Sequence, residues 1–192
     1  MVHINISLHI SMKNIESQSK NNLETPEYPK ELTEKDIQLI NKQCLLQSAI
    51  SKEQVEGFAQ AYKEAKDLVQ DSDQFKTLNG EKIKNIILRF AALIEKRNEK
   101  GYRRVPVTFR DGNTALKPEL IGRAMKNFSQ SYAEGVLESL EAYTEFEKIH
   151  PFEDGNGRLG DLLWKMDAKR KTGKWPEELP PDVFGDKRQL EN

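Results

Sequence analysis

The stretch from His150 to Arg158 constrains the fold more than any other part of the sequence, because small and polar residues interrupt two apolar helical patterns there. It reads His-Pro-Phe-Glu-Asp-Gly-Asn-Gly-Arg. Before it, apolar residues at helical spacing lead into Ile149, and after it the helical repeat resumes with Leu159, Leu162, Leu163 and Met166. The stretch is therefore predicted to be a loop held between two buried helices, the placement that a catalytic loop needs.

The residue types in this loop point to chemistry on phosphate groups. A Gly-Asn-Gly turn at 155–157 that opens a helix presents unpaired N–H groups and the positive end of the helix dipole, which together bind anions. Arg158 adds a bidentate partner for phosphate, and Asp154 could hold Mg²⁺ against the same phosphates. His150 is the group in the loop that can accept a proton near neutral pH. The pattern predicts nucleotidyl or phosphoryl transfer.

In its order and spacing, the loop resembles the signature of the Fic (filamentation induced by cyclic AMP) family, in the Fic/Doc superfamily. The resemblance implies an all-α fold, a Fic-like helical bundle with one β-hairpin flap. It also implies a protein adenylyltransferase that uses Mg²⁺ to transfer AMP from ATP to a hydroxyl side chain of a target protein.

The resemblance assigns roles position by position. His150 would be the general base for the target hydroxyl, Asp154 would bind Mg²⁺, and Phe152 would fix the loop by packing into the core. The donor phosphates would be held by the backbone of Gly155, Asn156 and Gly157 and by the side chain of Arg158. Glu153 falls at the variable position of the signature, and we assign it no role.

The chain departs from the family pattern at Asp161, where most adenylylating relatives carry a second arginine for the terminal phosphates of ATP. A carboxylate there would repel a polyphosphate, or could pair with Arg158 and draw it away from phosphate. Four interpretations stay open. The protein could use a different donor and transfer UMP, phosphate or phosphocholine, or Lys165 could act as a substitute cation. Alternatively, the transfer activity could be lost, or Asp161 could merely face water.

Two further possibilities concern partners. The family's inhibitory motif, Ser/Thr-x-x-x-Glu-Gly/Asn, is missed at Glu56-Gly57 because Lys52 stands at its first position, and it is missed in the same way at Glu191-Asn192. An internal inhibitory glutamate is therefore not expected, although a separate inhibitor or antitoxin-like partner is possible. The alternative from another class is a non-catalytic module that uses the anion pocket or the flap to hold a partner.

Between residues 102 and 117 the apolar period changes from helical to alternating, which predicts a β-hairpin. Val105, Val107 and Phe109 alternate with polar or Pro residues, and a turn follows at 111–112. Pro106 restricts the hairpin to a sheet edge, and such an edge could accept an extended peptide. By resemblance, this hairpin is the flap on which the target protein docks.

The rest of the sequence predicts helices from capping residues and apolar spacing. Thr33 and Ser51 are predicted N-caps, Pro118 suits a first helical turn, and Gly135 marks a break. The apolar helical positions are Ile37, Ile40 and Cys44; Val55, Phe58, Ala59, Tyr62 and Val69; Ile83, Ile86, Ile87, Phe90 and Ile94; Ile121, Met125, Phe128 and Tyr132; and Val136, Leu140 and Tyr143.

Composition bounds the organisation and excludes some partners. A chain of 192 residues suits one domain, predicted at 30–185 with its Fic-like core at about 80–170, after a flexible or partly docked arm at 1–29 and before a tail at 186–192. A net charge of −1 gives no basic face for nucleic acid. With no secretory or membrane-spanning segment expected, we predict a cytoplasmic protein, or one delivered to a host cytosol.

Overall fold

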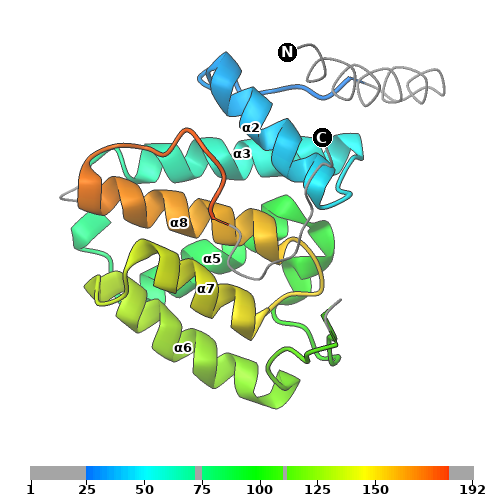
Figure 1. The fold of residues 1–192 in the computed structure, drawn as a ribbon, viewed down its shortest axis with the longest axis vertical. Coiled ribbons are helices and arrows are strands. Elements are labelled where there is room, and N and C mark those ends of the chain that lie inside the picture. The colour runs from blue at the N-terminus through cyan, green and yellow to red at the C-terminus, as the bar shows by residue number, and fades with distance from the viewer. Residues whose placement is uncertain (1–24, 72–74, 110–111, 182–192) are drawn as a thin grey trace, which may run out of the picture.

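The computed structural model describes residues 25–71, 75–109 and 112–181 of the chain. Within these ranges six α-helices are defined from end to end together with one 3-10 helix, and none of the described residues forms a β-strand (Figure 1). The predicted all-α class is therefore confirmed. The helices are α2 (Glu34–Leu46), α3 (Lys52–Leu68), α5 (Gly80–Ile94), η1 (Lys96–Lys100), α6 (Pro118–Glu134), α7 (Ser139–Ile149) and α8 (Asn156–Thr172).

Side-chain caps start the first helices where the sequence predicts them. Thr33 and Asp36 form a reciprocal capping box at the start of α2. Ser51 caps α3 by accepting a hydrogen bond of 3.3 Å from the amide of Gln54. The apolar face that follows each cap is buried in the core, including Cys44 on α2.

Helix α8 lies in the middle of the bundle, where it contacts α3, α5 and α7 (Figure 1). Its side chains are buried all round from Arg158 to Asp167, and not only along the leucine stripe that the sequence predicts. The two turns of helix directly after the loop therefore have almost no exposed surface. This central position fixes the carboxyl end of the 150–158 loop.

The predicted apolar start of the helix before the loop is wrong. Gly135 does end α6 in a left-handed conformation, with φ at 70°, so the predicted break is confirmed. Val136 then lies in the turn, 68% exposed, and Leu140 is 39% exposed on the outer face of α7. Helix α7 begins at Ser139 and is held to the core by Ala142, Phe146 and Ile149.

The described parts of the 102–117 segment do not form the predicted two-stranded hairpin. One isolated antiparallel bridge joins Thr108 to Thr114. Beside it, the amide of Phe109 donates to Asn113 O at 2.7 Å, and the amide of Ala115 donates to Val107 O at 2.9 Å. Pro106 has no N–H to extend this ladder. The segment is an extended loop with a short paired tip, and residues 110–111 of the predicted turn lie outside the described residues.

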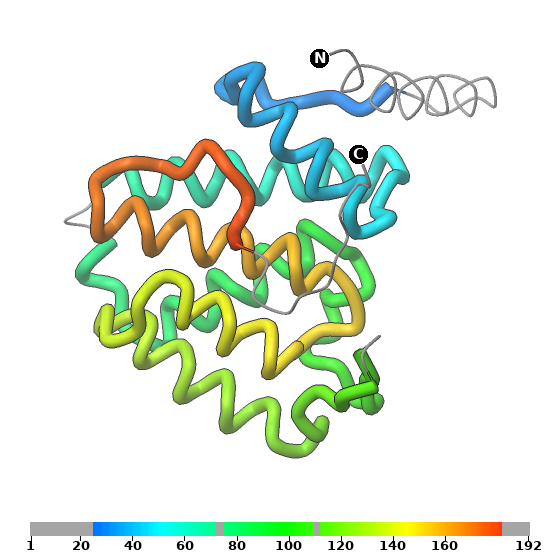
Figure 2. The backbone as a smooth tube through the Cα atoms, viewed as in Figure 1, coloured from blue at the N-terminus to red at the C-terminus, as the bar shows by residue number. Residues whose placement is uncertain are grey.

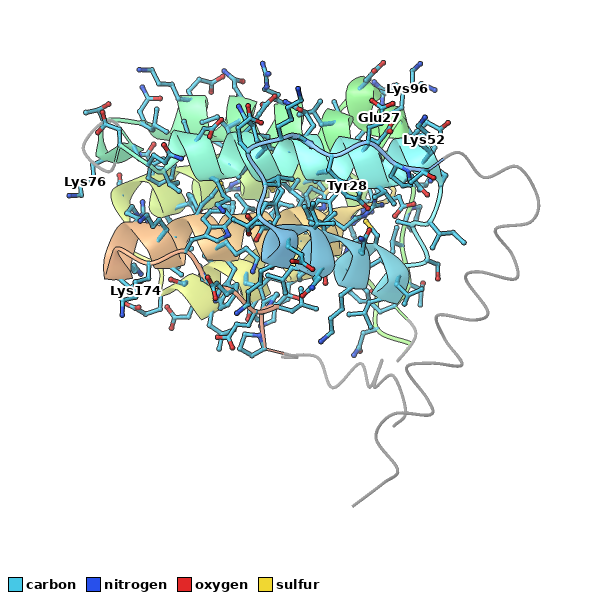
Figure 3. The ribbon with its side chains drawn as sticks, turned by 90° about the horizontal axis from the view of Figure 1, so that it is seen from above. Glu27, Tyr28, Lys52, Lys76, Lys96 and Lys174 are labelled. Atoms are coloured by element: carbon cyan, nitrogen blue, oxygen red, sulfur yellow. The ribbon has the colours of Figure 1, made fainter. Side chains whose placement is uncertain are left out.

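Both described ends of the chain pack on the helices near α2 and α3. The stretch from residue 25 runs along α3, where the amide of Glu27 donates to Glu56 (Figure 3), and the hydroxyl of Tyr28 donates to Asn41 on α2. After α8 the chain turns back over that helix (Figure 2), and Trp175 Nε1 donates to the Tyr62 hydroxyl at 2.9 Å.

None of the helices in the described part of the chain combines the length and the apolar character needed to cross a membrane.

Candidate active site

His150 is held in a backbone conformation that few residues other than glycine adopt. It is the C-cap of α7, with φ at 48°, and its amide donates to Phe146 O at 3.0 Å. A left-handed residue with a side chain stores strain that the surrounding structure must offset, and such strain concentrates at functional sites. The sharp turn at His150 ends α7 and starts the loop.

The imidazole of His150 is neutral at pH 7. Its side chain is 20% exposed, and the ring of Phe109 packs edge-on against it at 5.1 Å between centroids. The pKa of His150 is lowered from 6.5 to about 4. Burial is the larger cause, and the nearby positive charge of Arg103 is the second. Glu147 Oε2 lies 3.9 Å from the ring Nδ1, which is beyond hydrogen-bond distance. A neutral ring is the form that can accept a proton.

Arg103 joins the start of the loop to both ends of the 102–117 segment. Its guanidinium donates to His150 O and Val105 O, both at 2.7 Å, and to Leu116 O at 2.5 Å. Its backbone amide donates to Pro151 O at 2.9 Å. The residue is 2% exposed, so these carbonyls replace its lost hydration. One side chain therefore sets the position of His150 relative to the segment above it.

Asn156 closes the loop on itself. Its side-chain oxygen accepts from the amide of Phe152 at 3.0 Å, while its Nδ2 donates to the carbonyl of the same residue at 2.9 Å. Gly155, with φ at 77°, packs so close to Ile94 that a Cβ would lie 2.7 Å from the Ile94 methyl carbon. Phe152 itself is fully buried against Tyr102. The turn is thus a rigid, closed unit.

The amino terminus of α8 supplies amides for an anion. Leu159 is the first residue of this turn whose amide bonds within the helix, to Gly155 O at 3.0 Å. Of the preceding amides, that of Gly155 donates to Asp154 Oδ1 at 2.6 Å, whereas those of Asn156, Gly157 and Arg158 belong to the first helical turn, which has no intrahelical partners. Gly157 also contacts α2, since Gln43 Nε2 donates to its carbonyl at 3.2 Å and a Cβ would lie 2.4 Å from Gln47 Nε2.

Asp154 directly precedes the Gly155–Gly157 turn, and Arg158 directly follows it. Arg158 is fully buried, donates to Ile94 O at 3.2 Å, and approaches Asp154 Oδ1 at 3.4 Å. Its Nε is buried without a hydrogen-bond partner among the described residues. The other oxygen of Asp154 pairs with Arg97 at 2.9 Å, and Asn98 donates to the Asp154 carbonyl at 2.9 Å.

Asp161 faces neither water nor Arg158. It is 1% exposed and pairs with Lys165 at 3.5 Å, inside the bundle. Lys165 is also fully buried, and it donates to Pro176 O at 3.1 Å and to Glu178 O. Burial raises the pKa of Asp161 to about 7 and lowers that of Lys165. The ideas that Asp161 merely faces water and that it draws Arg158 aside are therefore wrong. Lys165 is occupied by the carboxyl-terminal segment.

Comparison with known proteins agrees with this arrangement. The sequence model of the Fic/DOC family matches residues 81–166, which run from α5 to the inner part of α8. Residues 81–166 form a Fic domain. None of the curated proteins matches the chain.

The Fic domain offers a limited set of groups for a cation. Within the described residues there is no cluster of three or more His, Cys, Asp and Glu side chains that could hold a metal ion. Asp154 is 37% exposed; its Oδ2 pairs with Arg97, and its Oδ1 accepts from the Gly155 amide at 2.6 Å. A single carboxylate fits Mg²⁺, which takes one or two carboxylates and completes its shell with phosphate oxygens and water. Arg97 would have to leave Asp154 as the cation arrives.

The Fic domain brings the predicted site residues into one short loop, and it adds residues that sequence reasoning did not assign. His150, Phe152 and Asp154 stand on the loop, while the Gly155 to Arg158 turn opens α8. Additional contacts come from Arg97, Asn98, Arg103, Phe109 and Gln43. The burial of Arg103 has no signal in the sequence.

We expect the His150 ring to stay neutral well below the usual range. Between about pH 8 and about pH 5 its NMR signals should not titrate, because burial and Arg103 both disfavour the imidazolium. The His150→Ala variant assigns the signals. In Arg103→Gln the pKa rises towards 6.5, since one of the two causes is removed while burial stays.

Arg103→Lys separates charge from geometry. It keeps the positive charge, so the pKa of His150 stays low, but it loses the fork of hydrogen bonds to the carbonyls. Arg123→Gln, on the exposed face of α6, is the matched control for loss of a charge and should leave the titration unchanged. A wild-type midpoint near 6.5 would contradict the burial argument.

Proposed function

We propose that this protein is a protein adenylyltransferase, which moves AMP from ATP to a hydroxyl side chain of a target protein. The hydroxyl oxygen attacks the α-phosphorus and forms the new P–O bond. The bond from that phosphorus to the oxygen bridging the α- and β-phosphates breaks, and pyrophosphate leaves. The proton of the hydroxyl passes to the neutral ring of His150.

One observation carries this proposal. The short loop that closes on itself through Asn156 holds a neutral His150 at one end and the unpaired amides of α8 at the other. A proton acceptor and an anion site at a fixed separation are the two parts that transfer to a hydroxyl requires. The Fic domain at residues 81–166 supports a transferase of this class.

The donor phosphates would lie on the amides of Gly155, Asn156 and Gly157, beside Arg158, and the Gly155 amide would have to leave Asp154 Oδ1 to bind them. The buried, unpartnered Nε of Arg158 fits an incoming anion, because a buried donor without an acceptor is costly. Asp154 would hold Mg²⁺, which when bound neutralises developing charge on the phosphates. Lys165 pairs with Asp161 in the bundle interior and also donates to Pro176 O and Glu178 O, so we do not propose Lys165 as the missing second cation.

The identity of the donor is tested with labelled nucleotides. Wild-type protein and His150→Ala are incubated with lysate and Mg²⁺ in the presence of labelled ATP, UTP or CDP-choline. We expect His150-dependent labelling from ATP. Labelling from UTP or CDP-choline but not from ATP would replace the AMP proposal with UMP or phosphocholine transfer. Binding of a partner without labelling from any donor would favour the non-catalytic module.

Removing the Asp154 carboxylate should weaken the response to Mg²⁺. In Asp154→Asn the Mg²⁺ concentration for half-maximal transfer should rise at least about tenfold, the loss that even an outer-shell partner causes in metal sites. The measurement is a Mg²⁺ titration of the initial rate at fixed ATP. Glu119→Gln, an exposed carboxylate on α6, should leave the curve unchanged. An Asp154→Asn curve equal to that of wild type would remove Asp154 from the metal site.

The target is proposed to dock on the 102–117 segment, beside the ring of Phe109 that covers His150. Val105 is 52% exposed there, and the isolated bridge leaves backbone groups available for an extended peptide. We further propose a cytoplasmic location, either in the producing cell or in a host.

A further inference from the structure

A basic cavity of about 250 Å³ opens beside the loop. Its walls come from η1, from the start of the 102–117 segment and from the loop itself. The lining residues are Arg97, Lys100, Gly101, Tyr102, Arg104 and Glu153. The cavity thus lies where three functional parts of the Fic domain meet.

The lining carries more positive than negative charge. Arg97, Lys100 and Arg104 are exposed cations, and Glu153 is the carboxylate that faces them. Arg97 is paired with Glu95 and Asp154, whereas Lys100 and Arg104 form no ion pair with any described residue. The whole chain has a net charge of −1, so this excess is local and not a general property of the surface. A local excess of this kind attracts an acidic partner and orients it.

The cavity also has a defined relation to the transfer site. Arg104 directly follows Arg103, whose guanidinium holds both His150 O and the ends of the 102–117 segment. Glu153 directly precedes Asp154 on the loop. A peptide that lies along the segment with its hydroxyl near His150 therefore passes the mouth of the cavity with neighbouring residues.

We propose that this cavity selects targets that carry acidic side chains close to the modified hydroxyl. The inference rests on the proposed function, in which a target segment docks at 102–117. The proposed function places the donor phosphates on the amides of α8, so we assign the cavity to the target and not to the donor. Lys100 and Arg104 receive the acidic side chains, and Glu153 disfavours basic ones.

The test measures peptide binding without transfer. His150→Ala protein, full length and without nucleotide, is titrated into fluorescein-labelled peptides that contain one Ser, Thr or Tyr between Glu residues, and into matched Gln peptides. We expect fluorescence anisotropy to show that the Glu peptides bind more tightly than the Gln peptides at low ionic strength. Adding Lys100→Gln and Arg104→Gln together should weaken it about tenfold, as loss of two exposed charge pairs implies. Arg123→Gln with Lys126→Gln, both exposed on α6, should not.

Equal affinity for Glu and Gln peptides, or equal losses in the test and control variants, would overturn the inference. Calorimetry with the same variants measures their affinity for MgATP. Weaker ATP binding with unchanged peptide binding would assign the cavity to the donor instead. Because the peptide experiment needs no catalysis, absence of AMP transfer does not affect it. Conversely, a transferase that labels targets without preference for Glu keeps the proposed function and loses this inference.

Discussion

Replacing His150 by alanine should lower the rate of AMP transfer by about a hundredfold to ten-thousandfold, the range expected when a positioned general base is lost. The ring is neutral because burial holds its pKa near 4, so in the wild-type protein it can accept a proton at any pH well above 4. The measurement is the initial rate of labelling of a lysate target from ATP. Binding of MgATP should change little, since the proposal places the phosphates on the amides of α8 and not on His150.

The control for this variant concerns the loop. His150 adopts a φ of 48°, so removing its ring could relax the turn as well as remove the base. His150→Asn keeps a residue that tolerates the left-handed conformation, and it should lose activity as fully as alanine while keeping the melting temperature of the wild type. Retained transfer in both variants would show that another group takes the proton.

Replacing Lys165 by methionine should lower the free energy of unfolding by about 3–5 kcal/mol, because the variant breaks a buried ion pair and leaves the Asp161 carboxyl, whose pKa burial already raises, without its partner. Both side chains are buried, and the ion pair spans 3.5 Å. Lys165 also anchors the carbonyls of Pro176 and Glu178, so the carboxyl-terminal segment should loosen in the same variant. Urea denaturation followed by circular dichroism measures the loss.

The double variant Asp161→Asn with Lys165→Met tests whether charge is the cause. It removes the buried anion together with its partner, so it should recover most of the stability that Lys165→Met loses. If the double variant is as unstable as the single one, packing or the anchored segment dominates instead. Asp161→Arg, which restores the family's second arginine, should destabilise the fold because the new cation would lie beside Lys165 in the bundle interior.

Local signals in the sequence predicted most of the helical architecture. The Thr33 capping box, the Ser51 cap and the Gly135 break all stand where local rules place them, because short-range hydrogen bonds and backbone angles decide these features. The start of α7 was mispredicted for the opposite reason. Val136 and Leu140 are apolar at helical spacing, but tertiary packing leaves both at the surface.

The polar interior of α8 could not be predicted from hydrophobic spacing. A leucine stripe marks one face of this helix, yet Asp161, Lys165 and Asp167 are buried on the others. Their burial depends on partners from distant parts of the chain, such as Ser139, which donates to Asp167 at 2.6 Å. The role of Arg103 could not be predicted for the same reason, because the carbonyls that it binds lie at the end of α7 and on the 102–117 segment. The residue types of the 150–158 loop could therefore be interpreted from the sequence, whereas the contacts that hold the loop in place could not.

The most direct test of the central claim uses ATP labelled at a chosen phosphorus. Wild-type protein and His150→Ala are incubated with Mg²⁺ and lysate, once with ATP labelled at the α-phosphorus and once with ATP labelled at the γ-phosphorus. The proposed chemistry puts the α-label on a target protein, leaves the γ-label in pyrophosphate, and needs His150 for both outcomes. Stable labelling of the target from the γ-phosphorus, or α-labelling that persists in His150→Ala, would contradict AMP transfer by this loop.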